Sequence, residues 1–217
     1  MPSVSLQATA DGQIAQNSPT TNYGADATMN VTSRGNTAPG SGFRNVRSLL
    51  LFDLSGIPAN ATIASATMSL LATSHTASGE NKVIRARRVV NHQFDEAAFT
   101  WDEYEAGSSW DTAGGDMSGT FVGEDLNMGS ADGVKQWNLT TLVQLWVNGT
   151  TNYGVLLRAS VENATTFETW TFATKEDATL ENRPVLDITY VEGSTEDLKN
   201  RYIRNRWQWR RIYGAGM

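Results

Sequence analysis

The sequence predicts an all-β fold with one short helix, and three observations indicate it. Thr, Val, Asn, Ser and Gly are abundant in the chain of 217 residues. Short runs of β-favouring residues are separated by turn residues throughout. Only one internal segment has helical spacing. About eight strands with one short helix are typical of a two-sheet jelly-roll β-sandwich, which we expect to end in a helical or extended C-terminal tail.

The first predicted strands lie in the N-terminal quarter of the chain. Residues 4–8 alternate apolar and polar side chains and lead into Asp11-Gly12, a pair typical of a turn. Residues 28–32 repeat the alternation. The run at 47–54 is mostly apolar and too short for an ordinary helix. We therefore expect it to be a strand buried on both faces.

The remaining strands follow the same composition. Residues 61–71 place apolar side chains for a core strand after a turn at Pro58. Further β-favouring runs lie at 82–90, 152–161, 168–174 and 184–191. Turn residues separate these runs, so each is predicted to be a strand of its own.

One internal helix is predicted to end at Gly149. Its apolar residues are separated by three, one and three positions; they are Leu139, Leu142, Val143 and Trp146. This spacing places them on one face of a helix, and Gly commonly follows the last helical residue.

Charge divides the chain into two parts. The protein has 17 basic and 23 acidic residues, a net charge of −6. Six basic residues and no acidic residue follow residue 198, which leaves 11 basic and 23 acidic residues, a charge of −12, for residues 1–198. We expect a β-sandwich domain at 1–193 and a docking tail at 194–217. The acidic body argues against nucleic acid as a partner, because phosphate contacts need clustered Lys and Arg.

The tail combines basic and aromatic residues. It begins with Ser194 and an acid three residues later, a pattern that resembles a helix capping box. Trp, Tyr and Arg are enriched at binding hot spots. We expect the tail to dock onto another protein or a symmetry-related copy through Arg201, Tyr202, Arg204, Arg206, Trp207, Trp209, Arg210, Arg211 and Tyr213.

Composition also bears on metals and membranes. The chain has no cysteine and two histidines, which argues against disulfides and zinc sites. No cofactor is expected, although calcium held by backbone carbonyls and Asp11, Asp26 or Asp53 remains an alternative. No apolar run approaches the roughly 20 residues of a membrane span, and the N-terminus lacks the pattern of a signal peptide.

Five blocks of the sequence resemble a known family in the family's own order. They are residues 10–31, 47–70, 99–116, 142–159 and 182–190. They resemble the DNRLRE domains, a group that partly overlaps carbohydrate-binding module family 96. The resemblance spans residues 4–191 and implies a β jelly-roll found in secreted or surface proteins, in some alginate lyases and in phage structural genes.

The resemblance leaves two functions open. A copy with a docking tail, and without signal peptide or catalytic domain, resembles a phage component. We therefore expect a non-enzymatic virion protein, such as a head decoration, fibre or tail-associated protein, located in the virion, with host surface glycans as further partners. The alternative is a carbohydrate-binding module that recognises an acidic polysaccharide.

Candidate sugar-binding residues lie in two segments. Trp101, Tyr104 and Trp110 lie on a Gly-rich loop, where aromatic rings can stack on sugars. The alternative is that the tryptophans pack against the ends of the sandwich. Arg85 and Arg87 lie on one face of a predicted strand and suit a polyanionic glycan, or pair with acids on neighbouring strands. No catalytic residue is predicted.

Overall fold

The structure is a computed structural model that describes residues 1–34, 45–77, 83–119, 125–164 and 167–193. The proposed docking residues at 201–213 lie outside these ranges, so the tail and its boundary at 193 stay predictions. The strands are β1 (Ser3–Ala15), β2 (Thr28–Ser33), β3 (Val46–Phe52), β4 (Thr62–Ala77), β5 (Val83–Arg88), β6 (Glu103–Glu105), β7 (Ser108–Ser109), β8 (Asp125–Asn127), β9 (Gly133–Asn138), β10 (Val155–Ala159), β11 (Glu168–Ala173) and β12 (Val185–Val191). The helices are α1 (Thr140–Val147) and the 3-10 helix η1 (Leu180–Asn182).

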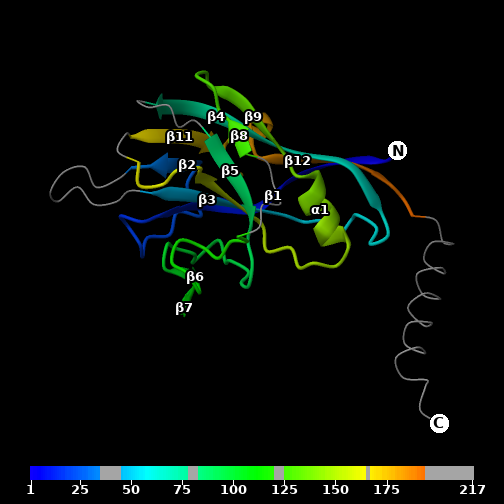
Figure 1. The fold of residues 1–217 in the computed structure, drawn as a ribbon, viewed down its shortest axis with the longest axis horizontal. Coiled ribbons are helices and arrows are strands. Elements are labelled where there is room, and N and C mark those ends of the chain that lie inside the picture. The colour runs from blue at the N-terminus through cyan, green and yellow to red at the C-terminus, as the bar shows by residue number, and fades with distance from the viewer. Residues whose placement is uncertain (35–44, 78–82, 120–124, 165–166, 194–217) are drawn as a thin grey trace, which may run out of the picture.

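Six strands close into an antiparallel ring in the order β1, β12, β4, β11, β2 and β3. Outside the ring, β10, β5 and β8 continue the sheet from β3, and β9 pairs with β4 (Figure 1). The mostly β fold is confirmed. The two-sheet jelly-roll is not confirmed, because β1 pairs with β12 through its first half and with β3 through its second, which joins all these strands into one sheet.

The predicted helix is confirmed as α1. Its buried residues include Leu142, Val143 and Trp146, and Gly149 follows the helix with a φ of +102°. The described helices include none that is long and apolar enough to cross a membrane.

The predicted turn at Asp11-Gly12 is wrong. β1 continues to Ala15, because residues 10–15 pair with residues 46–51 of β3. Gly12 has a φ of +145°, and a Cβ at this position would lie 2.9 Å from the Phe99 ring. The glycine therefore serves the close approach of another segment and not a chain reversal.

β3 is buried on both faces, as its mostly apolar sequence predicts. Leu50 and Phe52 contribute to the larger core. Leu49 belongs to a second core with Ile14 and Leu156 on the outer face. Each fully buried side chain of this size stabilises the fold by about 2 kcal/mol, so the outer face requires a cover.

That cover is residues 89–118, here named the cap segment. It contains β6 and β7, which lie on the opposite side of the molecule from β4 and β9 in the view of Figure 1. Its apolar residues complete the second core; they are Val89, Phe94, Phe99, Trp101 and Trp110. The turn at Asn22 fastens it, because the Asn22 side chain donates hydrogen bonds to the carbonyls of Glu96, at 3.0 Å, and Phe99, at 2.8 Å.

Candidate functional site

The aromatic residues predicted to stack on sugars lie in the cap segment. Trp101 and Trp110 are only 7% and 5% exposed, because they belong to the second core. Tyr104 is partly buried and stacks on His92 at 4.3 Å between ring centroids. The packing alternative is therefore favoured for the two tryptophans, and Tyr104 is the member of the trio with a partly exposed ring. Their role in sugar binding stays a prediction.

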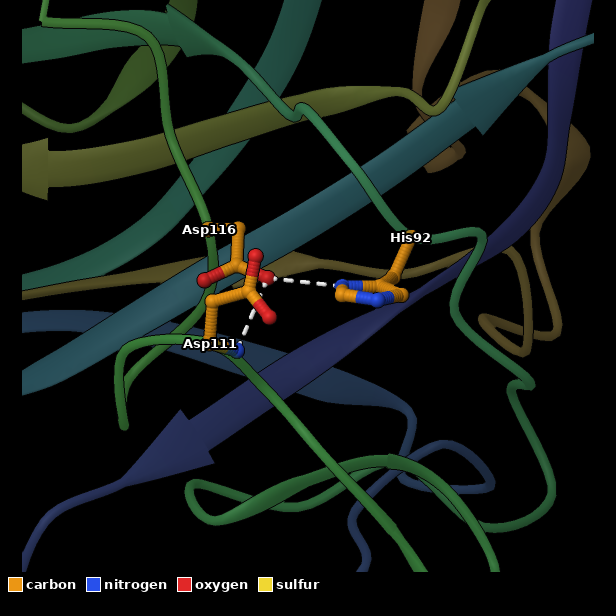
Figure 2. A group of neighbouring side chains, drawn as sticks. All are labelled: His92, Asp111 and Asp116. Atoms are coloured by element: carbon orange, nitrogen blue, oxygen red, sulfur yellow. Dashed lines mark hydrogen bonds and ion pairs between the residues drawn. The ribbon is translucent and has the colours of Figure 1, made fainter.

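Beside Tyr104, three side chains of the cap segment form a compact polar cluster, His92, Asp111 and Asp116 (Figure 2). The two oxygens of Asp116 accept hydrogen bonds from His92 Nδ1 at 2.8 Å, from the Asp111 amide at 3.1 Å and from the Thr112 amide at 2.8 Å. Asn91 donates to Asp111. Although these groups are close enough to share a cation, Asp116 already has three donors. The cluster is therefore better suited to hold the loop together by hydrogen bonds than to bind a metal.

Four arginines form a second group, here named the arginine face: Arg47 of β3, Arg158 of β10, and Arg85 and Arg87 of β5. β10 lies between β3 and β5, and the register places Arg158 opposite Arg85. Arg85 and Arg87 flank the buried Ala86, so they point away from the larger core. Sequence reasoning identified this pair but missed Arg47 and Arg158, which only the pairing of β3, β10 and β5 brings beside them.

Glu162 joins two members of the arginine face. Arg47 binds it with two parallel hydrogen bonds of 2.7 and 2.8 Å, and Arg158 binds it at 2.9 Å. Burial lowers the pKa of Arg158, and repulsion from Arg47, Arg85 and Arg87 lowers it further, against the attraction of Glu162. Arg85 and Arg87 have contacts of their own, and the backbone of Asp125 pairs with that of Arg85. The charges of Arg47, Arg85 and Arg87 all act on Arg158, so the four guanidinium groups form one group.

Arg47 also connects this face to the cap segment. Its guanidinium donates to the Gly114 carbonyl at 2.6 Å and lies 4.9 Å from the centre of the Trp101 ring. A Cβ on Gly114 would lie 2.7 Å from both groups, which explains the glycine at this position. The arginine is therefore held rigidly at the border between sheet and cap.

A third group consists of Asp11 on β1, Glu96 in the cap segment and Glu176 just after β11, with Lys175 beside them. One oxygen of each carboxylate lies within 4.8 Å of the others. Lys175 Nζ contacts Glu96 at 2.9 Å and also pairs with Glu176. We name this group the carboxylate cluster.

The predicted calcium ligands are separated by the fold. Asp11 is buried in the carboxylate cluster, whereas Asp26 and Asp53 are exposed and belong to neither described group that could hold a metal. Sequence reasoning missed Glu96 and Glu176, because no local motif links residues so far apart. In the sequence, their negative charge is the only sign that Glu96 and Glu176 could bind a cation.

A hollow of about 400 Å³ lies beside the end of β3. Its lining is neutral apart from one acid and comprises Thr9, Leu51, Phe52, Asp53, Leu54, Ser55, Gln93 and Asn152. It carries no positive charge among these residues, so it suits a neutral ligand better than an acidic one.

A protein-family model matches most of the chain. The model of carbohydrate-binding module family 96 matches residues 2–190, which include the arginine face, the cap segment and the carboxylate cluster. No curated protein sequence shows significant similarity to the chain. The part of the predicted resemblance that concerns this family is confirmed. The DNRLRE group and the phage context are not tested by the match.

Proposed function

Because the chain belongs to carbohydrate-binding module family 96, we propose that it is a non-catalytic module that binds an acidic polysaccharide through its arginine face. The family match supports carbohydrate binding. The acidic character of the glycan and the position of the site are inferences from the arrangement of charges on β3, β10 and β5.

The observation that carries the proposal is the gathering of four guanidinium groups on three adjacent strands. Planar guanidinium groups bind carboxylates with paired hydrogen bonds, as Arg47 does with Glu162. Arg47 is buried, so the partly exposed cations are Arg158 of β10 and Arg85 and Arg87 of β5, on neighbouring strands about 4.8 Å apart. Such a row favours an extended chain of uronic acids over a single sugar.

The other surfaces support this glycan less well. The two tryptophans of the cap segment are buried, so their faces are not open for stacking. The hollow at the end of β3 contains Asp53, which would repel a uronate carboxylate. Among the surfaces of the described residues, the arginine face is thus the one whose charge best fits the ligand.

Calorimetric titration tests the proposal with a polyuronate oligosaccharide and a neutral glucan of equal length. We expect binding of the polyuronate alone. The double variant Arg85→Gln/Arg87→Gln should bind it at least about tenfold more weakly, which corresponds to about 1.4 kcal/mol.

Arg183→Gln is the control for each single Arg→Gln change, because it removes one positive charge next to β12, which does not pair with β3, β10 or β5. The proposal is contradicted if no variant changes the affinity, or if the control loses as much affinity as the double variant. Preference for the neutral glucan would also contradict it.

The virion function remains a prediction without support from the comparisons. It rests on the tail at 194–217, which lies outside the described residues, and on a resemblance to phage components that no finding tests. The family match favours the carbohydrate-binding alternative. Docking to other virion proteins or to symmetry-related copies stays a separate expectation of the sequence.

A further inference from the structure

The carboxylate cluster brings together three segments that are distant in sequence. Asp11 lies within β1, Glu96 in the cap segment and Glu176 after β11. A calcium ion bound at about 2.4 Å from each ligand oxygen requires those oxygens to lie no more than about 4.8 Å apart. The three carboxylates meet this requirement, since one oxygen of each lies within 4.8 Å of the other two.

Two oxygens of the cluster are buried without a hydrogen-bond donor. Asp11 is 0% exposed; its Oδ2 accepts from the Lys175 amide at 2.9 Å, but its Oδ1 has no partner. Glu176 Oε2 is also buried and without a partner. Within the described part of the chain, these two are the only buried side-chain oxygens in that condition. Buried carboxylate oxygens are normally satisfied by a donor or a metal, so both oxygens suit a cation as partner.

The charges of the cluster do not balance. Lys175 supplies one positive charge through its contacts with Glu96 and Glu176, against three carboxylates. With all three carboxylates ionised the cluster carries two excess negative charges, which a divalent cation would neutralise.

We propose that Asp11, Glu96 and Glu176 bind a calcium ion that fastens the cap segment to the barrel. All three ligands are oxygens, which suit a hard cation, and the cluster contains neither His nor Cys to favour zinc. Calcium tolerates the irregular geometry of three separate segments better than magnesium, which demands a near-ideal octahedron.

The position of Glu96 gives the ion a structural role. Its Oε1 accepts a hydrogen bond from the Asp11 amide at 2.7 Å, and its carbonyl accepts one from Asn22. Gly24 packs so closely that a Cβ would lie 2.0 Å from the Glu96 carbonyl oxygen. A cation at this point joins the cap segment to β1 and to the end of β11. The second core, with Trp101 and Trp110, lies beneath the same segment.

Calcium titration of the full chain at about pH 8 tests the proposal after treatment with a chelator. We expect calorimetric binding of calcium, a thermal midpoint raised by several degrees and lower access of a fluorescence quencher to the tryptophans. Asp11→Asn removes the charge with little change of shape and should abolish all three responses. Asp111→Asn makes the same change in the other polar cluster and should retain them.

The proposal is overturned if the wild-type protein shows no binding at roughly 10 mM calcium, which exceeds the dissociation constants of weak extracellular calcium modules. An undiminished response in Asp11→Asn, or an equal response of the wild type to magnesium, also overturns it. If Asp11→Asn fails to fold, Glu176→Gln provides the same test at a less buried ligand. Loss of the calcium response there supports the site, and retention overturns it.

Discussion

The arginine face and the carboxylate cluster both gather like charges, but they differ in burial and in how the charge is compensated. On the arginine face, three of the four arginines are partly exposed, and Glu162 joins Arg47 to Arg158. In the carboxylate cluster, Asp11 is completely buried, and one lysine faces three carboxylates. Water weakens repulsion at a surface far more than in an interior. The partly exposed arginine face therefore suits a large ligand at the surface, whereas the buried carboxylate cluster requires a small counterion.

The cluster of His92, Asp111 and Asp116 sharpens this comparison. It also contains two carboxylates, and Asp116 is buried, yet N–H donors satisfy both oxygens of Asp116, and Figure 2 shows the two bonds from His92 and Asp111. Proximity of acids alone is thus a poor indicator of a metal site. The number of unsatisfied buried oxygens separates the two acidic groups, and it favours the carboxylate cluster as the proposed cation site.

The largest expected effect is the pH dependence caused by Asp11 in a chelator. The pKa of Asp11 is raised from 3.8 to about 7, so the folded state holds its proton more tightly than the unfolded state does. Its contribution to stability is therefore present below about pH 3.8 and is lost as the pH rises to about 7. This difference in pKa corresponds to on the order of 4 kcal/mol.

Urea unfolding of the wild type and Asp11→Asn across this pH range measures that loss. The wild type should lose stability relative to the variant as the pH rises, with Glu96, Glu176 and Lys175 unchanged in both proteins. Addition of calcium should restore the stability of the wild type at the upper end of the pH range. If the free energy of unfolding changes with pH by the same amount in both proteins, the ionisation of Asp11 does not destabilise the fold as predicted.

A smaller effect is expected from Glu162→Gln on the arginine face. The substitution leaves Arg47, whose side chain is 10% exposed, without its carboxylate and should cost about 3 kcal/mol. The affinity for polyuronate should stay equal or increase, because the variant lacks an anion that competes with the ligand. Thermal melting and calorimetry check the two effects separately.

Glu181→Gln serves as the control, since Glu181 is exposed on η1. It should change neither quantity. If Glu162→Gln folds but binds polyuronate more weakly, Glu162 helps to bind the ligand. That result would contradict the claim that Glu162 competes with the ligand for the arginines.

The sequence predicts the elements of this fold better than their connections. The apolar residues of β3 indicate burial on both faces, and the spacing from Leu139 to Trp146 identifies α1. The pair Asp11-Gly12 has the composition of a turn, and only the approach of Phe99 explains why it lies within a strand. Local patterns determine local structure, whereas a strand that changes partners along its length depends on distant segments.

The candidate sites show the same limit. Arg85 and Arg87 are recognisable because they alternate on one strand, but Arg158 joins them only through the register of β10. Trp101 and Trp110 have the composition of a sugar platform, and the covering role of the cap segment buries them instead. Glu176 carries no local signal at all, since its partner Asp11 lies at the other end of the chain.

The most direct test of the proposed function is to locate the ligand on the protein. Amide chemical shifts of the labelled protein, recorded with increasing polyuronate oligosaccharide, report which strands the sugar contacts. We expect the largest saturable changes on β3, β10 and β5, around Arg47, Arg85 and Arg158. Changes centred on the hollow at Asp53 and Asn152, or no saturable change at millimolar ligand, would contradict the assignment of the arginine face as the glycan site.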